Sequence, residues 1–188
     1  IDELEEEQPL DESNEDYWWA GMAFPHTNKY LPDEDKYDFP PSGNASGTNY
    51  PLFRFPEVLL IYAEAVNEQG GPTAEAIEAF NRVRRRAGLS EWPNVNDLDG
   101  NPYPDNQEGF RQAIRQERRW ELCYEGKRLF DLRRWGNLVE TFQARATAPD
   151  ATPQDQIRAQ NIELKHNLYP IPFGEIQKNP KLTQNPGY

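Results

Sequence analysis

The chain has 188 residues, a formal net charge of −12 and a mean hydropathy of −0.97. This length is enough for one domain with a sizeable core, and no apolar run approaches the roughly 18 residues that cross a bilayer as a helix. Because the net charge is strongly negative, binding to nucleic acid phosphates is disfavoured. One cysteine excludes an intrachain disulfide, and two distant histidines offer no zinc-ligand spacing, so we predict neither a metal nor another cofactor.

Residues 1–50 show no lasting hydrophobic periodicity, and we predict an irregular acidic lead-in for this segment. The first 19 residues contain nine acids and no base, which is the composition of a solvated segment. Two adjacent tryptophans, Trp18 and Trp19, end the acidic stretch. A loop rich in glycine, serine and asparagine follows at 42–47.

A helix hairpin is predicted over residues 51–90. Its first helix should run over about 56–68, beginning with a proline that suits a first helical turn. The second helix should begin after a Thr73 cap and end at Gly88. The apolar stripe expected to be buried on the first helix consists of Leu59, Tyr62, Ala63 and Val66. The hairpin spans the 34 residues from 55 to 88, the length of a tetratricopeptide repeat, which would need neighbouring repeats; a generic helix hairpin is the alternative.

The segment 91–188 is predicted to contain further helices between long irregular loops. Helices are expected at 108–124, 128–132 and 138–144, with a break at Gly126, a linker containing Pro149 and Pro153, and a single turn at 173–177. Prolines near the end should hold the remaining tail extended as a strap over the helices. The chain is therefore predicted to be mainly α-helical: a tetratricopeptide-like hairpin, then C-terminal helices with long loops.

Charged residues between 117 and 134 recur at separations of three and four, where helical side chains meet. Large apolar residues interrupt this pattern, which disfavours a fully solvated face. We predict a partly buried structural ion-pair network under aromatic cover. Its members are expected to be Arg118, Glu121, Glu125, Arg128, Asp131 and Arg134.

The carboxylates of Glu117, Glu121 and Glu125 also suggest a glycosidase, whose chemistry uses paired carboxylates. Two features disfavour that reading. The neighbouring arginines should keep the carboxylates ionised, whereas a general acid needs a raised pKa. The three side chains also project from one helix, whereas a glycosidic bond must be flanked from two sides.

The loop at 94–101 is rich in asparagine and aspartate, but it does not fit the EF-hand spacing, which leaves only another kind of calcium site open. Aromatic residues in or beside loops are candidates for sugar binding, because the apolar faces of pyranose rings stack on tryptophan and tyrosine. The candidates for glycan contact are Trp18, Trp19, Trp92 and Tyr103.

The chain resembles the SusD/RagB family of outer-membrane nutrient-binding lipoproteins. The resemblance begins with the sequence FRFPEVLLIYAEA at 53–65, followed by NRVR at 81–84. It continues with the charged and aromatic block at 117–135, then YPIP at 169–172 and QNPGY at 184–188. These separated blocks, in the order expected of the family, cover roughly residues 50–188.

The resemblance implies a SusD-like helical fold of the α-α superhelix type, of which residues 1–188 would be the C-terminal part. It implies a non-enzymatic protein on the surface of the outer membrane, held by a lipid anchor in the absent N-terminal part. Its partner would be a SusC-like TonB-dependent β-barrel transporter, and its ligand a glycan or oligosaccharide captured for import. The alternatives are a helical-repeat scaffold that binds a protein partner and, with less support, a glycan-degrading enzyme.

Overall fold

The computed structural model describes Lys29 and residues 50–188. The chain divides into two units, Ile1–Tyr50 and Pro51–Tyr188. All helices that the structure describes belong to the second unit. The predicted acidic lead-in, with Trp18 and Trp19, lies outside the described residues.

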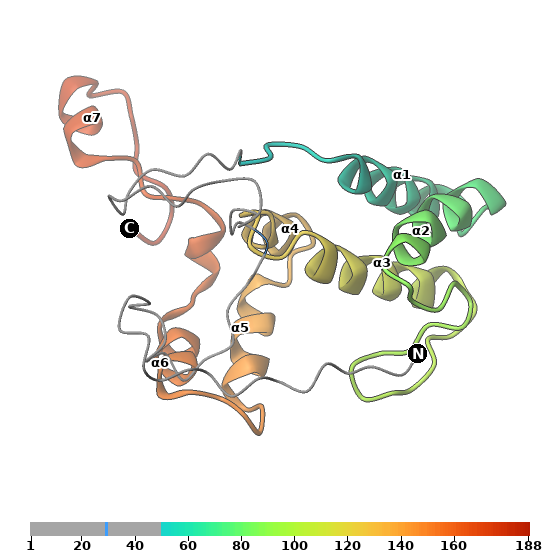
Figure 1. Cartoon of the computed structure of the whole chain (residues 1–188). Helices are drawn as coiled ribbons and strands as arrows, with labels where there is room; N and C mark the ends of the chain where they lie inside the picture. The colour runs from blue at the N-terminus through green and yellow to red at the C-terminus, as the bar shows by residue number, and fades with distance from the viewer. Residues whose placement is uncertain (1–28, 30–49) are drawn as a thin grey trace, which may run out of the picture. The chain divides into compact units, whose positions relative to one another are not determined.

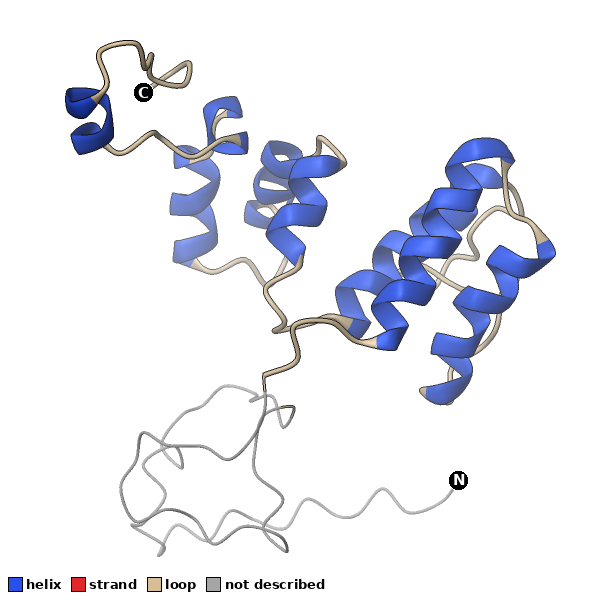
Figure 2. Ribbon diagram, turned by 90° about the horizontal axis from the view of Figure 1, so that it is seen from above, coloured by secondary structure: helices blue, strands red, loops and turns tan. Residues whose placement is uncertain are grey.

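The described part of the chain is helical, without a β-strand (Figures 1 and 2). Its elements are α1 (Phe55–Gly70), α2 (Ala74–Arg86), α3 (Gln107–Glu121), α4 (Arg128–Arg134), α5 (Leu138–Ala146), α6 (Pro153–Asn161), a 3₁₀ turn (Leu164–Asn167) and α7 (Phe173–Lys178). The predicted mainly α-helical class is confirmed.

Helices α1 and α2 begin and end within two residues of the predicted positions. The Thr73 hydroxyl accepts a hydrogen bond from the backbone N–H of Ala76 at 3.3 Å and caps α2. Beyond α2, Gly88 adopts a left-handed backbone with φ of +69°, a conformation that costs little without a Cβ. This turn lets the N–H of Leu89 bind the carbonyl of Arg84 at 3.0 Å.

The end of α3 differs from the prediction, because the helix stops at Glu121 rather than continuing to residue 124. Tyr124 and Gly126 both have left-handed backbones, with φ of 63° and 71°, and turn the chain into α4. The linker predicted around Pro153 is wrong, because α6 begins there. Its start carries a capping box between Thr152 and Asp155 with proline in the first turn, a signal that sequence analysis missed.

A hydrophobic core joins α1, α2, α3 and the loop that follows α2. Helix α1 packs against both α2 and α3. The centroid of the Phe110 ring on α3 lies 5.3 Å from the ring centroid of Phe80 on α2 and 5.0 Å from that of Trp92 in the loop. The buried core residues are Leu60, Ala63, Ala76, Ala79, Phe80, Val83, Trp92, Val95, Phe110, Ala113 and Ile114.

The apolar stripe predicted on α1 is only partly buried. Leu60, which was not assigned to that stripe, is fully buried, and Ala63 lies beside it in the core. Tyr62 is exposed, as are Val58 and Ile61 of the same helix. The three-helix core therefore buries one face of α1 and leaves an apolar face on it uncovered within the described residues.

A second group of helices follows, in which α5 packs against α4 and α6. Among the described residues, no helix is both long enough and apolar enough to cross a membrane.

Candidate functional site

Glu117, Arg118 and Glu121 in the last turns of α3 find their partners on other elements rather than along their own helix. Arg118 donates two hydrogen bonds to Asp131 of α4, from Nε to Oδ2 at 3.0 Å and from Nη2 to Oδ1 at 2.9 Å. Both side chains are only 4% exposed. This two-pronged pair joins α3 to α4 in a site shielded from water, where a charge without its partner would be costly.

Arg134 extends the cluster from α4 to α1. Its two Nη atoms each donate to the Glu64 carboxylate at 2.6 Å, and Nε donates to Asp131 at 3.0 Å. The indole N–H of Trp135 also donates to Glu64, at 2.7 Å. Burial raises the pKa of Glu64, but the hydrogen bonds from Arg134 and Trp135 outweigh it and leave that pKa below its usual value.

The lowered pKa of Glu64 predicts a loss of stability in acid. A carboxyl whose pKa is lower in the folded than in the unfolded state stabilises the fold above its unfolded pKa, and loses this effect as the pH falls through its folded pKa. We expect Glu64→Gln to be less stable than the original chain at neutral pH. The difference should shrink as the pH falls below the ordinary value of 4.5. Urea unfolding of both proteins at neutral and acidic pH measures it.

The control for this prediction is Glu175→Gln, at an exposed carboxylate that pairs with Lys178. This variant should show no comparable pH-dependent difference. A Glu64→Gln effect that is equal at both pH values would contradict the role of the ionised carboxylate.

Arg54, immediately before α1, ties the start of that helix to the end of α3. Its Nη1 lies 2.8 Å from Glu121 Oε1, and its Nε donates to Glu125 Oε1 at 2.8 Å. Glu121 also binds Arg86 of α2 at 2.5 Å. The left-handed backbone at Tyr124 belongs to the turn that carries Glu125 back to Arg54.

Glu117 shows why these carboxylates are poor candidates for catalysis. It is buried and pairs with Arg84 of α2 at 2.5 Å. Burial raises the pKa of Glu117 above its ordinary value, although the contact with Arg84 acts in the opposite direction. A group with a raised pKa could act as an acid, but this one is buried and engaged by an arginine, so it is not accessible to a glycosidic bond.

Arg128 departs from the predicted network. Asp131 is engaged by Arg118 and Arg134, and Arg128 forms no ion pair among the described residues. Its guanidinium group instead lies over the Trp135 ring, 5.6 Å from the centroid. Sequence analysis also missed the ion-pair partners that lie outside residues 117–135. Their only signal in the sequence was that they belong to other charged motifs. These partners are Arg54, Glu64, Arg84 and Arg86.

Of the predicted sugar-binding aromatics, Trp92 and Tyr103 lie among the described residues, and both pack in or against the hydrophobic core. Trp92 is 5% exposed and belongs to the core, so its expected exposure in a loop is wrong. Tyr103 is partly buried against the same core, and Trp18 and Trp19 lie outside the described residues.

Two residues at the end of α3 are exposed: Trp120, in the last turn of the helix, and Cys123, just beyond its end.

No group of three histidine, cysteine, aspartate or glutamate residues that could hold a metal occurs in the part of the chain that the structure describes. The loop proposed for calcium closes on itself. Asp97 Oδ1 accepts hydrogen bonds from the N–H groups of Asp99 at 2.9 Å and Asn101 at 2.8 Å. In these contacts the aspartate side chain binds the backbone of the residues that follow it, so the loop is an aspartate turn.

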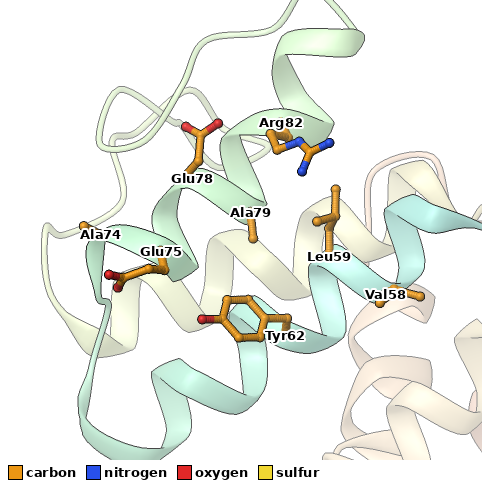
Figure 3. Close-up of a pocket in the computed structure, with 8 residues that line it drawn as sticks. All are labelled: Val58, Leu59, Tyr62, Ala74, Glu75, Glu78, Ala79 and Arg82. Atoms are coloured by element: carbon orange, nitrogen blue, oxygen red, sulfur yellow. The ribbon is translucent and has the colours of Figure 1, made fainter.

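Two grooves lined by residues that the structure describes are candidate binding surfaces. One, of about 610 Å³, lies between α1 and α2 (Figure 3). Leu59 and Tyr62 of α1 face α2, whose charged side chains Glu75, Glu78 and Arg82 line the other side. The second, of about 950 Å³, is lined by α4, α5 and α6 together with parts of α3 and the loop after α2.

The sequence matches the SusD family over residues 6–188. SusD-like protein P25 of Formosa agariphila is 40% identical over 136 residues, covering 71% of this chain and 23% of that protein. The starch-binding protein SusD of Bacteroides thetaiotaomicron is 29% identical over 144 residues, covering 75% of this chain and 22% of that protein. The chain thus spans about a quarter of the length of these two relatives.

The crystal structure of a SusD homolog from Bacteroides thetaiotaomicron superposes with a TM-score of 0.64 at 35% identity. The superposition covers 83% of this chain and 31% of the chain of that homolog. A SusD superfamily protein from Bacteroides vulgatus gives a TM-score of 0.60 at 31% identity, covering 76% of this chain and 28% of that one.

Proposed function

Because the chain belongs to the SusD family, we propose that it is part of a non-enzymatic glycan-binding protein. The observation that carries this proposal is its similarity to a relative named as a starch-binding protein. The burial of Glu117 and its pairing with Arg84 also favour binding over hydrolysis.

We further propose that the protein works at the cell surface of the outer membrane, attached through a lipid anchor. Its partner would be a SusC-like TonB-dependent β-barrel that imports the captured oligosaccharide. The charged cluster would then have a structural role, holding α1, α3 and α4 in fixed positions while ligand contacts come from other surfaces.

The glycan-binding proposal is tested by titrating the full chain with neutral oligosaccharides, beginning with maltoheptaose, in a calorimeter. We expect measurable binding to at least one of them. Replacing both Trp18 and Trp19 by alanine should weaken that binding about tenfold or more, because each stacked ring contributes roughly 0.5–1.5 kcal/mol.

Phe173→Ala is the matched control, since it removes an exposed aromatic ring on α7 that is not among the proposed sugar contacts. Equal weakening by the control would remove the case for the two tryptophans. Hydrolysis of the saccharide by purified protein would contradict a purely binding role.

The transporter partnership is tested separately by purifying the tagged protein from detergent-solubilised outer membranes. Co-purification of a large TonB-dependent barrel is the expected result. Recovery of a different protein partner without glycan binding would favour the helical-repeat scaffold.

A further inference from the structure

The groove bordered by α4, α5 and α6 is distinguished by how its arginines are paired. Four arginines line it, and two of them are neutralised within the groove. Arg145 pairs with Asp150 at 2.5 Å and with Asp155 at 3.3 Å, while Arg158 lies 3.5 Å from Asp155. Arg145 therefore joins α5 to α6, whereas Arg158 pairs within α6.

The other two arginines, Arg119 and Arg128, form no ion pair with any residue that the structure describes. Asp99 and Glu140 also line the groove but pair with neither of them among those residues. The charges acting most strongly on Arg128 are those of Arg119, Asp131, Arg115 and Arg118, of which only Asp131 is negative. Burial, together with these like charges, lowers the pKa of Arg128, so the surroundings of this guanidinium group are short of negative charge.

Two side chains that line the groove also carry a polar atom without a partner among the described residues. Nη1 of Arg128 and Oδ1 of Asn137 are buried without a hydrogen-bond partner among the described residues. Thr141, one turn along α5 from Asn137, adds a hydroxyl group to the lining. Buried polar atoms are usually paired in folded proteins, so two unpaired ones in side chains of one groove need an explanation.

These features specify the chemistry of a ligand. An arginine guanidinium group recognises planar or tetrahedral oxyanions through parallel hydrogen bonds. Asparagine and threonine side chains suit hydroxyl groups, which both donate and accept. The volume of about 950 Å³ is within the range of small-molecule sites, and charged side chains line it together with apolar ones.

We propose that this groove binds an acidic saccharide, a sugar ring carrying a carboxylate or sulfate group, with Arg119 and Arg128 as contacts to the anionic group. This inference rests on the proposed glycan-binding function and names its ligand class. Asn137 and Thr141 would contact ring hydroxyls beside that group.

The test compares saccharides that differ only in charge. Calorimetric titration of the full chain with hexagalacturonate and with its fully methyl-esterified form isolates the carboxylate, and dextran sulfate against dextran of equal length isolates the sulfate. We expect at least one acidic form to bind about tenfold or more tightly than its neutral counterpart. That preference should weaken as salt is added, because the salt ions screen the attraction between the arginines and the anionic group.

Arg119→Gln is the primary variant, because this side chain is exposed and its replacement leaves no buried group unpaired. It should reduce the preference for the acidic form about fivefold or more, and Arg119→Glu should abolish it. Arg85→Gln is the matched control: it removes the same charge from an exposed arginine of α2 that is already paired with Glu78 and Glu91. Arg128→Lys, checked for folding by thermal melting, keeps the charge but loses the parallel hydrogen bonds and should bind the acidic form more weakly.

The outcomes separate this inference from the broader function. Binding of neutral and acidic forms with equal affinity, or equal effects of Arg119→Gln and Arg85→Gln, would overturn the acidic-saccharide site and leave glycan binding standing. Absence of binding to every saccharide, including the neutral ones, would overturn both. The comparison of hexagalacturonate with its methyl ester and the comparison of dextran sulfate with dextran together identify which anion the groove prefers.

Discussion

Replacing Asp131 by asparagine is expected to lower the free energy of unfolding by about 3–5 kcal/mol, the usual loss when one partner of a buried ion pair is removed. The asparagine keeps the shape of the side chain but not its charge. Arg118 would then remain buried, 4% exposed, without the carboxylate that binds both its Nε and its Nη2. Arg134 would lose its hydrogen bond to the same carboxylate. Urea unfolding at neutral pH measures the change.

Asp150→Asn is the matched control, since Asp150 also pairs with an arginine, Arg145, but is 79% exposed. Solvent and salt screen such a pair, so its loss should leave the free energy of unfolding nearly unchanged. Similar effects at the two positions would contradict the buried character of the Arg118–Asp131 pair. A double variant, Asp131→Leu with Arg118→Met, should recover much of the stability, because it leaves no charge behind.

Phe110→Ala should destabilise the fold as strongly as Asp131→Asn, because it removes a packed core side chain rather than a charge. The Phe110 ring is fully buried and contacts both Phe80 and Trp92. Its removal leaves a cavity where α2, α3 and the loop after α2 meet, and the free energy of unfolding should fall by about 3–5 kcal/mol. Denaturant unfolding measures the loss of stability, and we expect the slope of the free energy against denaturant concentration to stay unchanged. Near-ultraviolet circular dichroism of the tryptophan band measures the change in packing.

Two comparisons make the Phe110 prediction specific. Phe110→Leu keeps most of the apolar volume and should cost clearly less than alanine. Phe173→Ala removes the same ring from a position that is 71% exposed and should have little effect. A loss at Phe110 no larger than that at Phe173 would show that the three-element core does not depend on this ring.

Local chemistry in the sequence was sufficient for most of the helices. The proline at the start of α1, the Thr73 cap and the left-handed Gly88 each act within a few residues, so their consequences can be predicted without knowing the fold. The same kind of signal was present at Thr152 and Asp155, and α6 could have been predicted from it. The early end of α3 was harder to predict, because Tyr124 is not a residue type that ordinarily adopts a left-handed backbone.

The sequence by itself determined the helical class and the family, and it indicated that charged residues of the 117–135 block form ion pairs. Only the tertiary structure decided which of them pair. Separations of three and four predict contacts along one helix, whereas Arg118 reaches Asp131, Glu121 reaches Arg54, and Arg134 reaches Glu64. Once these long-range pairs form, Arg128 is left facing a groove without a carboxylate partner among the described residues, a property that no local pattern contains. Helix formation depends on neighbours in the chain, but ion pairing and burial depend on neighbours in space.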